Sequence, residues 1–181
     1  MKKFLMVLCG FVMIPLWAQV QKYSWDFSDC EIRDILYAVS LDTGFSIVAD
    51  DTVKGTGTFK FVGDDFEKAF DSFLATSRLY VSKNDGLWTV SRCRVEVEND
   101  LISLDVFDLS PSQILDKISV VVEKPISFDS LPNNHLTMHF RNLNEIELLE
   151  KICMYFSGYQ VNESESGYHF SKKNNSRIED F

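Results

Sequence analysis

The sequence has little positive charge. It contains 18 Lys and Arg residues against 27 Asp and Glu residues, and its formal net charge at pH 7 is −9. Both halves of the chain are acidic, since residues 23–91 and residues 101–171 each carry a net charge of −6. Binding to nucleic acid or to anionic lipid depends on clustered Lys and Arg, so both are poor partners for this surface. The proportions of hydrophobic and charged residues, 45% and 25%, are those of a globular protein.

Long apolar runs are missing after the first 19 residues. Two lysines precede an apolar run over residues 4–17, and Ala18 follows as a small residue. This order is typical of a secretory signal peptide, which we expect over residues 1–19, with cleavage after Ala18. The run is shorter than the ~20 residues of a membrane-spanning helix. Lipidation at Cys9 is disfavoured because bulky Leu8 precedes it. We therefore expect an exported, soluble mature chain with no transmembrane segment.

Cysteine is scarce as well. Three cysteines remain in the expected mature chain, and an odd number cannot all pair. In the internal repeat described below, Cys30 aligns with Leu109 and Cys153 aligns with Leu74. A position that accepts Leu in one copy favours a core thiol in the other, because a buried thiol behaves as a small hydrophobic group. A single disulfide that involves Cys93 is the alternative.

Motifs of familiar catalytic chemistry are absent. The sequence has no calcium-loop spacing, no Gly-rich phosphate loop and no nucleophile elbow. His135 and His139 fall on one face of an expected strand, but residues four apart on a strand lie about 13 Å apart and cannot share one metal ion. His169 is isolated near the end of the chain. We expect no catalytic, cofactor-binding or metal-binding residues, and the partner-binding residues stay unassigned.

What the sequence does contain is an internal repeat with a constant offset of 79 residues. Residues 23–81 align with residues 102–160 without a gap, and 11 of the 59 aligned pairs are identical. In the first copy the members of the identical pairs are Ser24, Asp26, Asp29, Ile35, Leu36, Ser40, Ile47, Asp50, Thr58, Phe61 and Tyr80. A repeat sets the size of the folding unit, which here is about 70 residues present twice. A unit of this size buries only roughly 60% of its unfolded surface, so each copy should be modestly stable.

Aspartates recur in both copies. Asp26 aligns with Asp105, and Asp50 aligns with Asp129. General acid–base catalysis needs two carboxyl groups in different environments within one cleft. Repeated aspartates at the ends of strands and helices are more simply turn and capping residues, and we interpret them so. An active site would break the repeat with polar residues in apolar surroundings, and we find none.

Each copy reads strand, helix, strand, strand, helix, strand, strand. Alternating apolar residues mark the strands, and apolar residues at helical spacing mark the helices. A row of phenylalanines in the second helix of the first copy could line a ligand pocket. Core packing is the favoured interpretation, because the second copy places Leu and Ile at the same sites. The predicted fold class is α+β, with two tandem small βαββαββ domains, each with two helices packed on small mixed sheets. The predicted ranges are a first domain over 20–91, a short charged linker over 92–100, a second domain over 101–171 and a flexible tail over 172–181.

Local signals place the helix starts. Ser110 and Gln113 flank Pro111 in an arrangement that is typical of a capping box with proline in the first turn. Ser28 and Glu31 offer a similar box in the first copy. We therefore predict side-chain caps at both helix starts.

Other signals place helix ends and turns. Gly44 should stop the first helix, and Pro125 should end its counterpart. Gly55 aligns with Asn134, and both residue types tolerate positive φ, so we predict the same left-handed turn in both copies. Residues 84–86, Asn-Asp-Gly, predict a tight hairpin.

Three segments of the first copy together resemble a known family. Residues 25–36 read as a strand followed by an aspartate and a helix, residues 42–50 as Thr-Gly and an apolar strand that closes on aspartate, and residues 66–74 as a second helix. This order resembles the short N-terminal domain shared by secretins and TonB-dependent receptors. The second copy keeps the aspartate-then-helix entry over residues 108–111, but Glu123 stands where the family has Gly.

The resemblance implies a function without catalysis. Domains of this family form periplasmic rings in secretins and contact an inner-membrane regulator in receptors. The chain resembles them in domain type alone, since 181 residues leave no room for a barrel. The resemblance implies a periplasmic or outer-membrane-associated protein-interaction module of a diderm bacterium, which would be a component or accessory of an envelope secretion or pilus system. The partner would be an envelope protein or further copies in a ring. A signalling adaptor that contacts an anti-sigma-type regulator is the alternative, and an exported enzyme is a third reading that the absence of a site disfavours.

Overall fold

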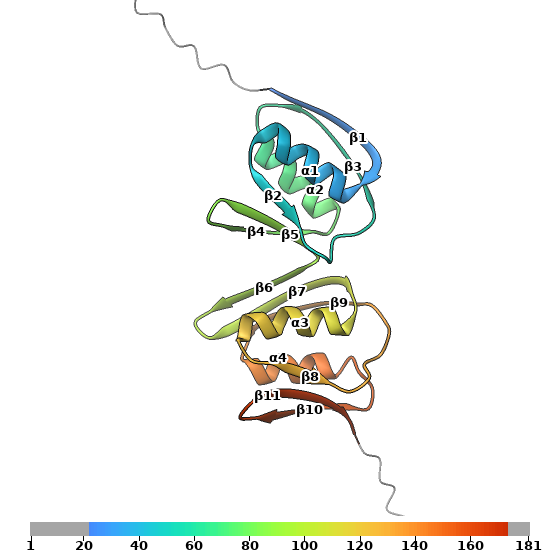
Figure 1. The fold of residues 1–181 in the computed structure, drawn as a ribbon, viewed down its shortest axis with the longest axis vertical. Coiled ribbons are helices and arrows are strands. Elements are labelled where there is room, and N and C mark those ends of the chain that lie inside the picture. Colours follow the sequence, from blue (N-terminus) through green and yellow to red (C-terminus); the bar gives the residue numbers. More distant parts are fainter. Residues whose placement is uncertain (1–21, 174–181) are drawn as a thin grey trace, which may run out of the picture.

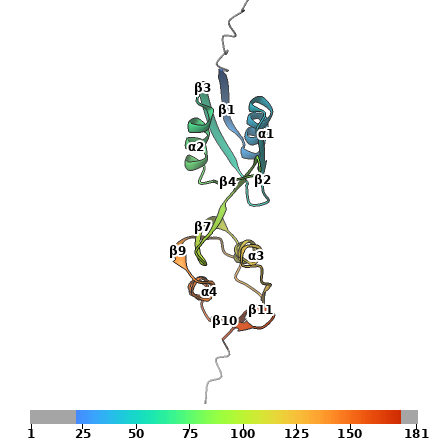
Figure 2. The ribbon, with the colours of Figure 1, turned by 90° about the vertical axis from the view of Figure 1, so that its left-hand side faces the viewer.

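The computed structural model describes residues 22–173, which form two units that follow one another along the long axis (Figure 1). The same succession is visible after a quarter turn (Figure 2). Unit one comprises β1 (Tyr23–Glu31), α1 (Ile32–Thr43), β2 (Ser46–Ala49), β3 (Thr56–Gly63), α2 (Phe66–Thr76), β4 (Tyr80–Asn84) and β5 (Leu87–Ser91). Unit two comprises β6 (Cys93–Glu98), β7 (Leu101–Leu109), α3 (Pro111–Val122), β8 (Ile126–Phe128), β9 (Leu136–Leu143), α4 (Glu145–Cys153), β10 (Tyr159–Ser164) and β11 (Gly167–Lys172). Residues 22–173 have an α+β fold, as predicted, with four helices on small antiparallel and mixed sheets.

The two units share one topology. In unit one β1 pairs antiparallel with β3, while β5 pairs parallel with β2 and antiparallel with β4. In unit two β7 pairs antiparallel with β9, while β11 pairs parallel with β8 and antiparallel with β10. The helices α1 and α3 begin at residues 32 and 111, and α2 and α4 begin at residues 66 and 145, which keeps the offset of 79. The sequence repeat is therefore a repeat of the fold.

β6 has no counterpart among the described residues of unit one. It pairs antiparallel with β7, on the edge opposite β9, and makes a three-stranded sheet. The prediction of a linker over 92–100 is wrong. The charges that suggested a linker lie on the outward face of β6, whereas Cys93 and Val95 alternate with them and pack on the core. Asn99 and Asp100 both have positive φ, 51° and 62°, and form the tight turn into β7.

The start of α3 is confirmed and the start of α1 is not. Ser110 and Gln113 form a capping box around Pro111. In unit one the residue before the helix is Glu31, which makes no side-chain cap. Ser28 cannot cap α1 because β1 continues through it to residue 31.

A left-handed residue interrupts β1 and β7 at the same place in the repeat. Asp29 has φ 52° and Asp108 has φ 55°, and the strand register shifts beside each. The amide of Asp29 donates to Oγ1 of Thr58 at 3.2 Å, and the amide of Asp108 donates to Oγ1 of Thr137 at 3.2 Å. Aspartate tolerates the left-handed region better than most residues, so this bulge explains two of the identical pairs.

The predicted left-handed turn occurs in unit one alone. Gly55 has φ 91°, but Asn134 is not among the residues with positive φ, so that prediction is wrong for unit two. In unit one the amide of Ile32 donates to the carbonyl oxygen of Gly55 at 3.0 Å and holds the loop against the helix start. The aligned residue is Pro111, which has no N–H to donate.

The ends of α1 and α3 differ in one residue. Gly44 caps α1 with φ 75°, as predicted. The cap of α3 is Glu123 with φ 54°, two residues before Pro125, so α3 ends ahead of this proline, as predicted. A glutamate here carries the strain that a side chain meets in the left-handed region.

Glu123→Gly should therefore stabilise unit two. We expect a gain of about 1 kcal/mol in the free energy of unfolding, because glycine adopts this conformation without a Cβ clash. Chemical denaturation of the two proteins measures it. The matched control is Gly44→Ala, which should destabilise unit one although a Cβ there meets no atom within 4 Å. A loss of stability in Glu123→Gly would contradict the assignment of strain.

Each unit has its own hydrophobic core. The buried members in unit one are Trp25, Ile32, Ile35, Leu36, Val39, Ile47, Val53, Phe59, Phe66, Phe70, Phe73, Leu74, Leu79, Trp88 and Val90. In unit two they are Cys93, Ile102, Leu104, Val106, Leu109, Ile114, Leu115, Ile118, Leu136, Met138, Leu148, Leu149, Ile152, Cys153, Phe156, Tyr159, Tyr168 and Phe170. The phenylalanine row of α2 is core, as predicted. No helix formed by residues 22–173 is long and apolar enough to span a membrane.

Two predicted segments fall largely outside the described part of the chain. The signal peptide over 1–19 lies wholly outside it. The tail over 172–181 begins inside it, where Lys172 is the last residue of β11.

Candidate functional site

Asp105 lies at the centre of a group of basic side chains on the sheet β6–β7–β9. Its side chain is 5% exposed. Arg94 Nη2, from β6, donates to Oδ2 at 2.7 Å, and Arg141 Nη2, from β9, donates to Oδ1 at 2.7 Å. His139 Nδ1, also from β9, lies 2.9 Å from Oδ1.

These contacts fix the charge of Asp105. Burial by itself would raise the pKa of this carboxyl group, but the hydrogen bonds from Arg94, His139 and Arg141 outweigh burial and lower the pKa from 3.8 to about 2. The carboxylate is ionised at neutral pH and its oxygens are occupied. It therefore holds three elements together and is unsuited to proton transfer near pH 7.

The sister residue Asp26 lies in the open. Its side chain is 71% exposed, and Lys60 Nζ lies 2.9 Å from Oδ1. Lys60 aligns with His139, so the cross-strand contact between an aspartate and a basic side chain is kept while its burial is not. The turn-or-capping interpretation is wrong for Asp26 and Asp105, which face their partners in mid-strand. It is right for Asp50, whose Oδ1 accepts the amide of Thr52 two residues later.

The three histidines lie beside three different aspartates. His135 Nδ1 is 3.1 Å from Asp108, and His139 Nδ1 is 2.9 Å from Asp105. His169 Nε2 is 3.6 Å from Asp129. Within residues 22–173 no group of three or more His, Cys, Asp or Glu side chains could hold a metal ion. The structure thus places each histidine beside a different aspartate.

The units touch through charged and aromatic side chains. Lys117 of α3 lies 2.9 Å from Asp50 and 3.2 Å from Asp51 of unit one. The guanidinium groups of Arg78 and Arg92 lie 4.5 Å and 5.4 Å from the ring centre of Phe107. Burial opposes ionisation of Asp50, but hydrogen bonds from Thr52 and Lys117 lower its pKa. A hollow of about 320 Å³ between β4, β5, β6 and α3 adjoins this contact.

All three cysteines of the described segment are free. Cys153 is buried in the core of unit two, as predicted, and so is Cys93. Cys30 is half-buried and packs at the margin of the first core, so the prediction of a core thiol is only partly confirmed for this residue. Burial raises the pKa of the Cys93 thiol to about 12 and raises that of Cys153 as well. Both buried thiols are protonated at neutral pH and are poor nucleophiles.

The thiols should differ in reactivity. In the folded protein at pH 8 we expect Cys30 to react with a disulfide reagent at least tenfold faster than Cys93, because the raised pKa of Cys93 leaves little thiolate. Absorbance of the released thiolate measures the rates. Cys30→Ser should abolish the fast phase, and unfolding in denaturant should expose the remaining thiols. A fast phase that survives Cys30→Ser would contradict the burial of Cys93 or of Cys153.

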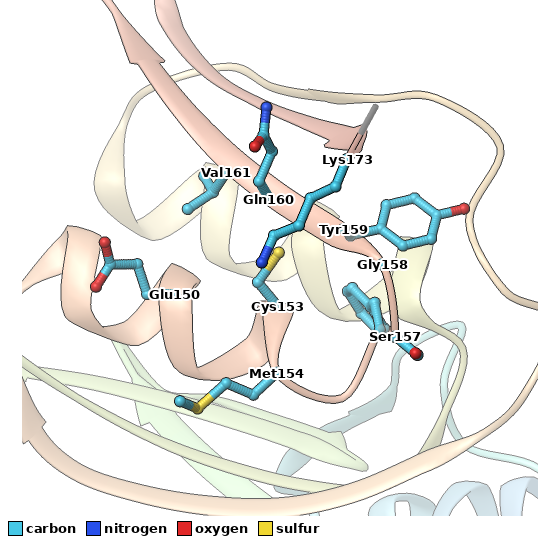
Figure 3. A pocket seen from close by; sticks show the side chains of 10 residues that line it. Glu150, Cys153, Met154, Ser157, Gly158, Tyr159, Gln160, Val161 and Lys173 are labelled. Atoms are coloured by element: carbon cyan, nitrogen blue, oxygen red, sulfur yellow. The ribbon is translucent and has the colours of Figure 1, made fainter. Parts of the chain in front are cut away.

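A second hollow, of about 440 Å³, lies at the end of α4 (Figure 3). Cys153, Met154, Tyr159 and Lys173 are among the side chains around it, and Lys173 extends over Cys153 in this view. The ammonium group of Lys173 favours the thiolate, but burial has the larger effect and keeps the pKa of Cys153 raised. The hollow therefore presents no activated nucleophile.

The outer edge of β1 is the remaining candidate. Among the described residues β1 pairs with β3 alone, whereas β7 pairs on both sides. Phe27 of β1 is half-buried, while the aligned Val106 of β7 is fully buried. An uncovered strand edge presents unpaired backbone N–H and C=O groups to a partner. No signal in the sequence could identify this edge, because it becomes visible only when β6 is seen beside β7.

No protein-family model matches the chain, and no curated protein matches it either. The resemblance to the secretin and TonB-dependent receptor domains therefore stays a prediction, carried by the residues that suggested it.

Proposed function

We propose that the chain is a non-enzymatic, exported periplasmic protein-interaction module, a component or accessory of an envelope secretion or pilus system. The supporting observation is that the contacts that recur in both units are structural ones. The amide–hydroxyl bond beside the bulge recurs, and so does the bond from Ser40 to the carbonyl of Phe45, which returns as Ser119 to Lys124. A site of chemistry would instead concentrate unusual polar groups in one unit.

The charged side chains support the same proposal. Asp105, Asp50 and Glu145 have lowered pKa values because hydrogen bonds stabilise their ionised forms, from Thr52 and Lys117 at Asp50 and chiefly from basic side chains at the other two. General acid–base catalysis near neutral pH needs a carboxyl group whose pKa is raised toward 7. The acidic surface and the uncovered edge of β1 suit the binding of a partner with basic side chains.

The test is affinity capture from detergent-solubilised envelopes with the full chain as bait, followed by mass spectrometry. The proposal expects a defined envelope protein, recovered in proportion to the bait and depleted by excess free chain. A secretion or pilus component supports the role proposed, whereas an inner-membrane regulator would reassign the chain to signalling. Consistent recovery of no specific protein would count against an interaction module.

A further inference from the structure

Unit two shows what covers the strand edge that unit one leaves open. β6 lies antiparallel along β7, and the two strands are seen side by side in Figure 1. The aligned edge, that of β1, carries no strand among residues 22–173. Because the units share their topology, β6 is a template for a strand that would dock on β1.

The template defines the side chains of such a strand. Cys93 lies opposite Val106, Arg94 opposite Asp105, and Val95 opposite Leu104. Cys93 is buried in the core, and Val95 packs against it. The pattern along β6 is thus apolar, basic, apolar. In unit one the same positions would face Phe27, Asp26 and Trp25.

The charges of unit one fit a basic residue at the central position. Asp105 has three basic neighbours, of which Arg94 comes from the added strand. Asp26 has Lys60 from β3, but Val62 stands where unit two has Arg141. A docked basic side chain would occupy the place of Arg94. Such a contact becomes stronger as docking excludes water from it.

The backbone of β1 is oriented for this pairing. The amide of Phe107 donates to the carbonyl oxygen of Arg92 at 2.9 Å, on the β6 side of β7. Phe107 aligns with Ser28, and the N–H groups of alternate residues in a strand point to the same side. The amides of Ser24, Asp26 and Ser28 therefore point to the open edge.

Helix α1 adds apolar surface beside that edge. In unit two α3 lies against β6, and Val120 and Val121 line the hollow next to Arg94 and Val95. The residue of α1 that aligns with Val120 is Leu41, which is 67% exposed. Val120 itself stays 77% exposed beside β6, so a docked strand would lie next to Leu41 without burying it.

We infer that the outer edge of β1 binds an extended segment of another protein in antiparallel orientation, with a Lys or Arg opposite Asp26 and an apolar residue on each side of it. The inference rests on the proposed function and names the surface and the partner chemistry. Strand addition of this kind takes its affinity from main-chain hydrogen bonds and its specificity from alternate side chains.

The test uses the full chain and synthetic peptides. The probe peptide copies residues 91–98 with Val in place of Cys93, and the control peptide also has Glu in place of Arg94. NMR titration should shift the amides of Ser24, Asp26 and Ser28, and the control peptide should bind at least tenfold more weakly. Asp26→Lys should reverse the preference between the peptides. Asp71→Lys changes the net charge equally on the exposed face of α2 and should leave the preference unchanged.

A second variant carries the docking strand covalently attached to the chain. Tethering raises the effective concentration of the strand, so docking can be detected even where the free peptide binds weakly. In this variant the expected signal peptide is left out and a copy of residues 93–100 directly precedes Lys22, which keeps the register of the β6–β7 hairpin. Hydrogen exchange of the Ser24 and Asp26 amides should slow at least tenfold. Unchanged exchange in the tethered chain, or peptide shifts confined to other strands, would overturn the inference.

The outcomes separate the two proposals. If envelope capture recovers a partner equally well with Asp26→Lys, binding at the outer edge of β1 is contradicted, while the proposed function as an interaction module is supported. If capture recovers none, the proposed function fails whatever the peptides do. Concentration-dependent shifts of the same amides without peptide would assign the edge to a second copy of the chain and overturn the proposed partner.

Discussion

Phe70→Ala is expected to lower the free energy of unfolding of unit one by about 4 kcal/mol. Phe70 is fully buried, and its ring lies 5.5 Å from that of Phe66, 6.3 Å from that of Phe73 and 6.0 Å from that of Trp88, measured between ring centres. The substitution removes most of a side chain at the centre of these contacts. A unit of about 70 residues has a total stability of roughly 4–10 kcal/mol. The variant should therefore leave unit one close to unfolding.

Unit two should survive this substitution, because the two cores are separate clusters. Residue-resolved NMR during denaturation distinguishes the units. The matched variant is Leu149→Ala, which changes the aligned core position of unit two and should have the reciprocal effect. Simultaneous loss of both units in either variant would show that the chain unfolds as one body.

Asp105→Asn is expected to lower the stability of unit two by about 2 kcal/mol, the magnitude that corresponds to the depression of its pKa. The substitution leaves Arg94 and Arg141 without their carboxylate. Both guanidinium groups are partly exposed and can return to water, which keeps the loss below that of a fully buried pair. Denaturation of the variant measures the effect. The control, Asp26→Asn, should change stability far less, because Asp26 is solvated. Equal effects at the two positions would contradict the assigned burial.

Asp105 should also make the stability of unit two depend on pH in the acid range. The pKa of Asp105 is lowered from 3.8 to about 2 on folding, so its contribution is complete above pH 4 and is lost as the pH falls toward 2. We expect the stability of unit two to decline across this window. In Asp105→Asn the decline should be shallower by about 2 kcal/mol. Parallel curves for the two proteins would show that other carboxyl groups cause the decline.

The repeat predicted much of the fold because offset and periodicity are local in the sequence. Gly44 capped α1 as expected, and Asp85 and Gly86 formed the hairpin turn with φ of 48° and 79°. The structure also explains two of the identical pairs. Asp29 and Thr58 form a hydrogen bond beside the bulge in unit one, and their counterparts form the same bond in unit two. A constant offset thus carried the register of unit one into unit two.

The prediction failed where contacts join distant residues. The charges of β6 suggested a linker, because outward-facing Arg94 and Glu96 reveal nothing of the inward face until β7 is paired with it. The burial of Asp105 depends on that same added strand. The loop near Asn134 has neither the left-handed residue of unit one nor the bond that holds that loop, and Pro111, far away in sequence, has no N–H to donate it.

Photo-crosslinking in living cells tests whether the open edge of β1 binds another protein. A photoreactive residue at Ser24 sits on the open edge of β1, and the same residue at Ser103 sits on the edge of β7 that β6 occupies. We expect a discrete crosslink from position 24 to one other protein, and none of that size from position 103. Identical patterns from both positions, or crosslinks at position 24 to copies of the chain alone, would contradict it.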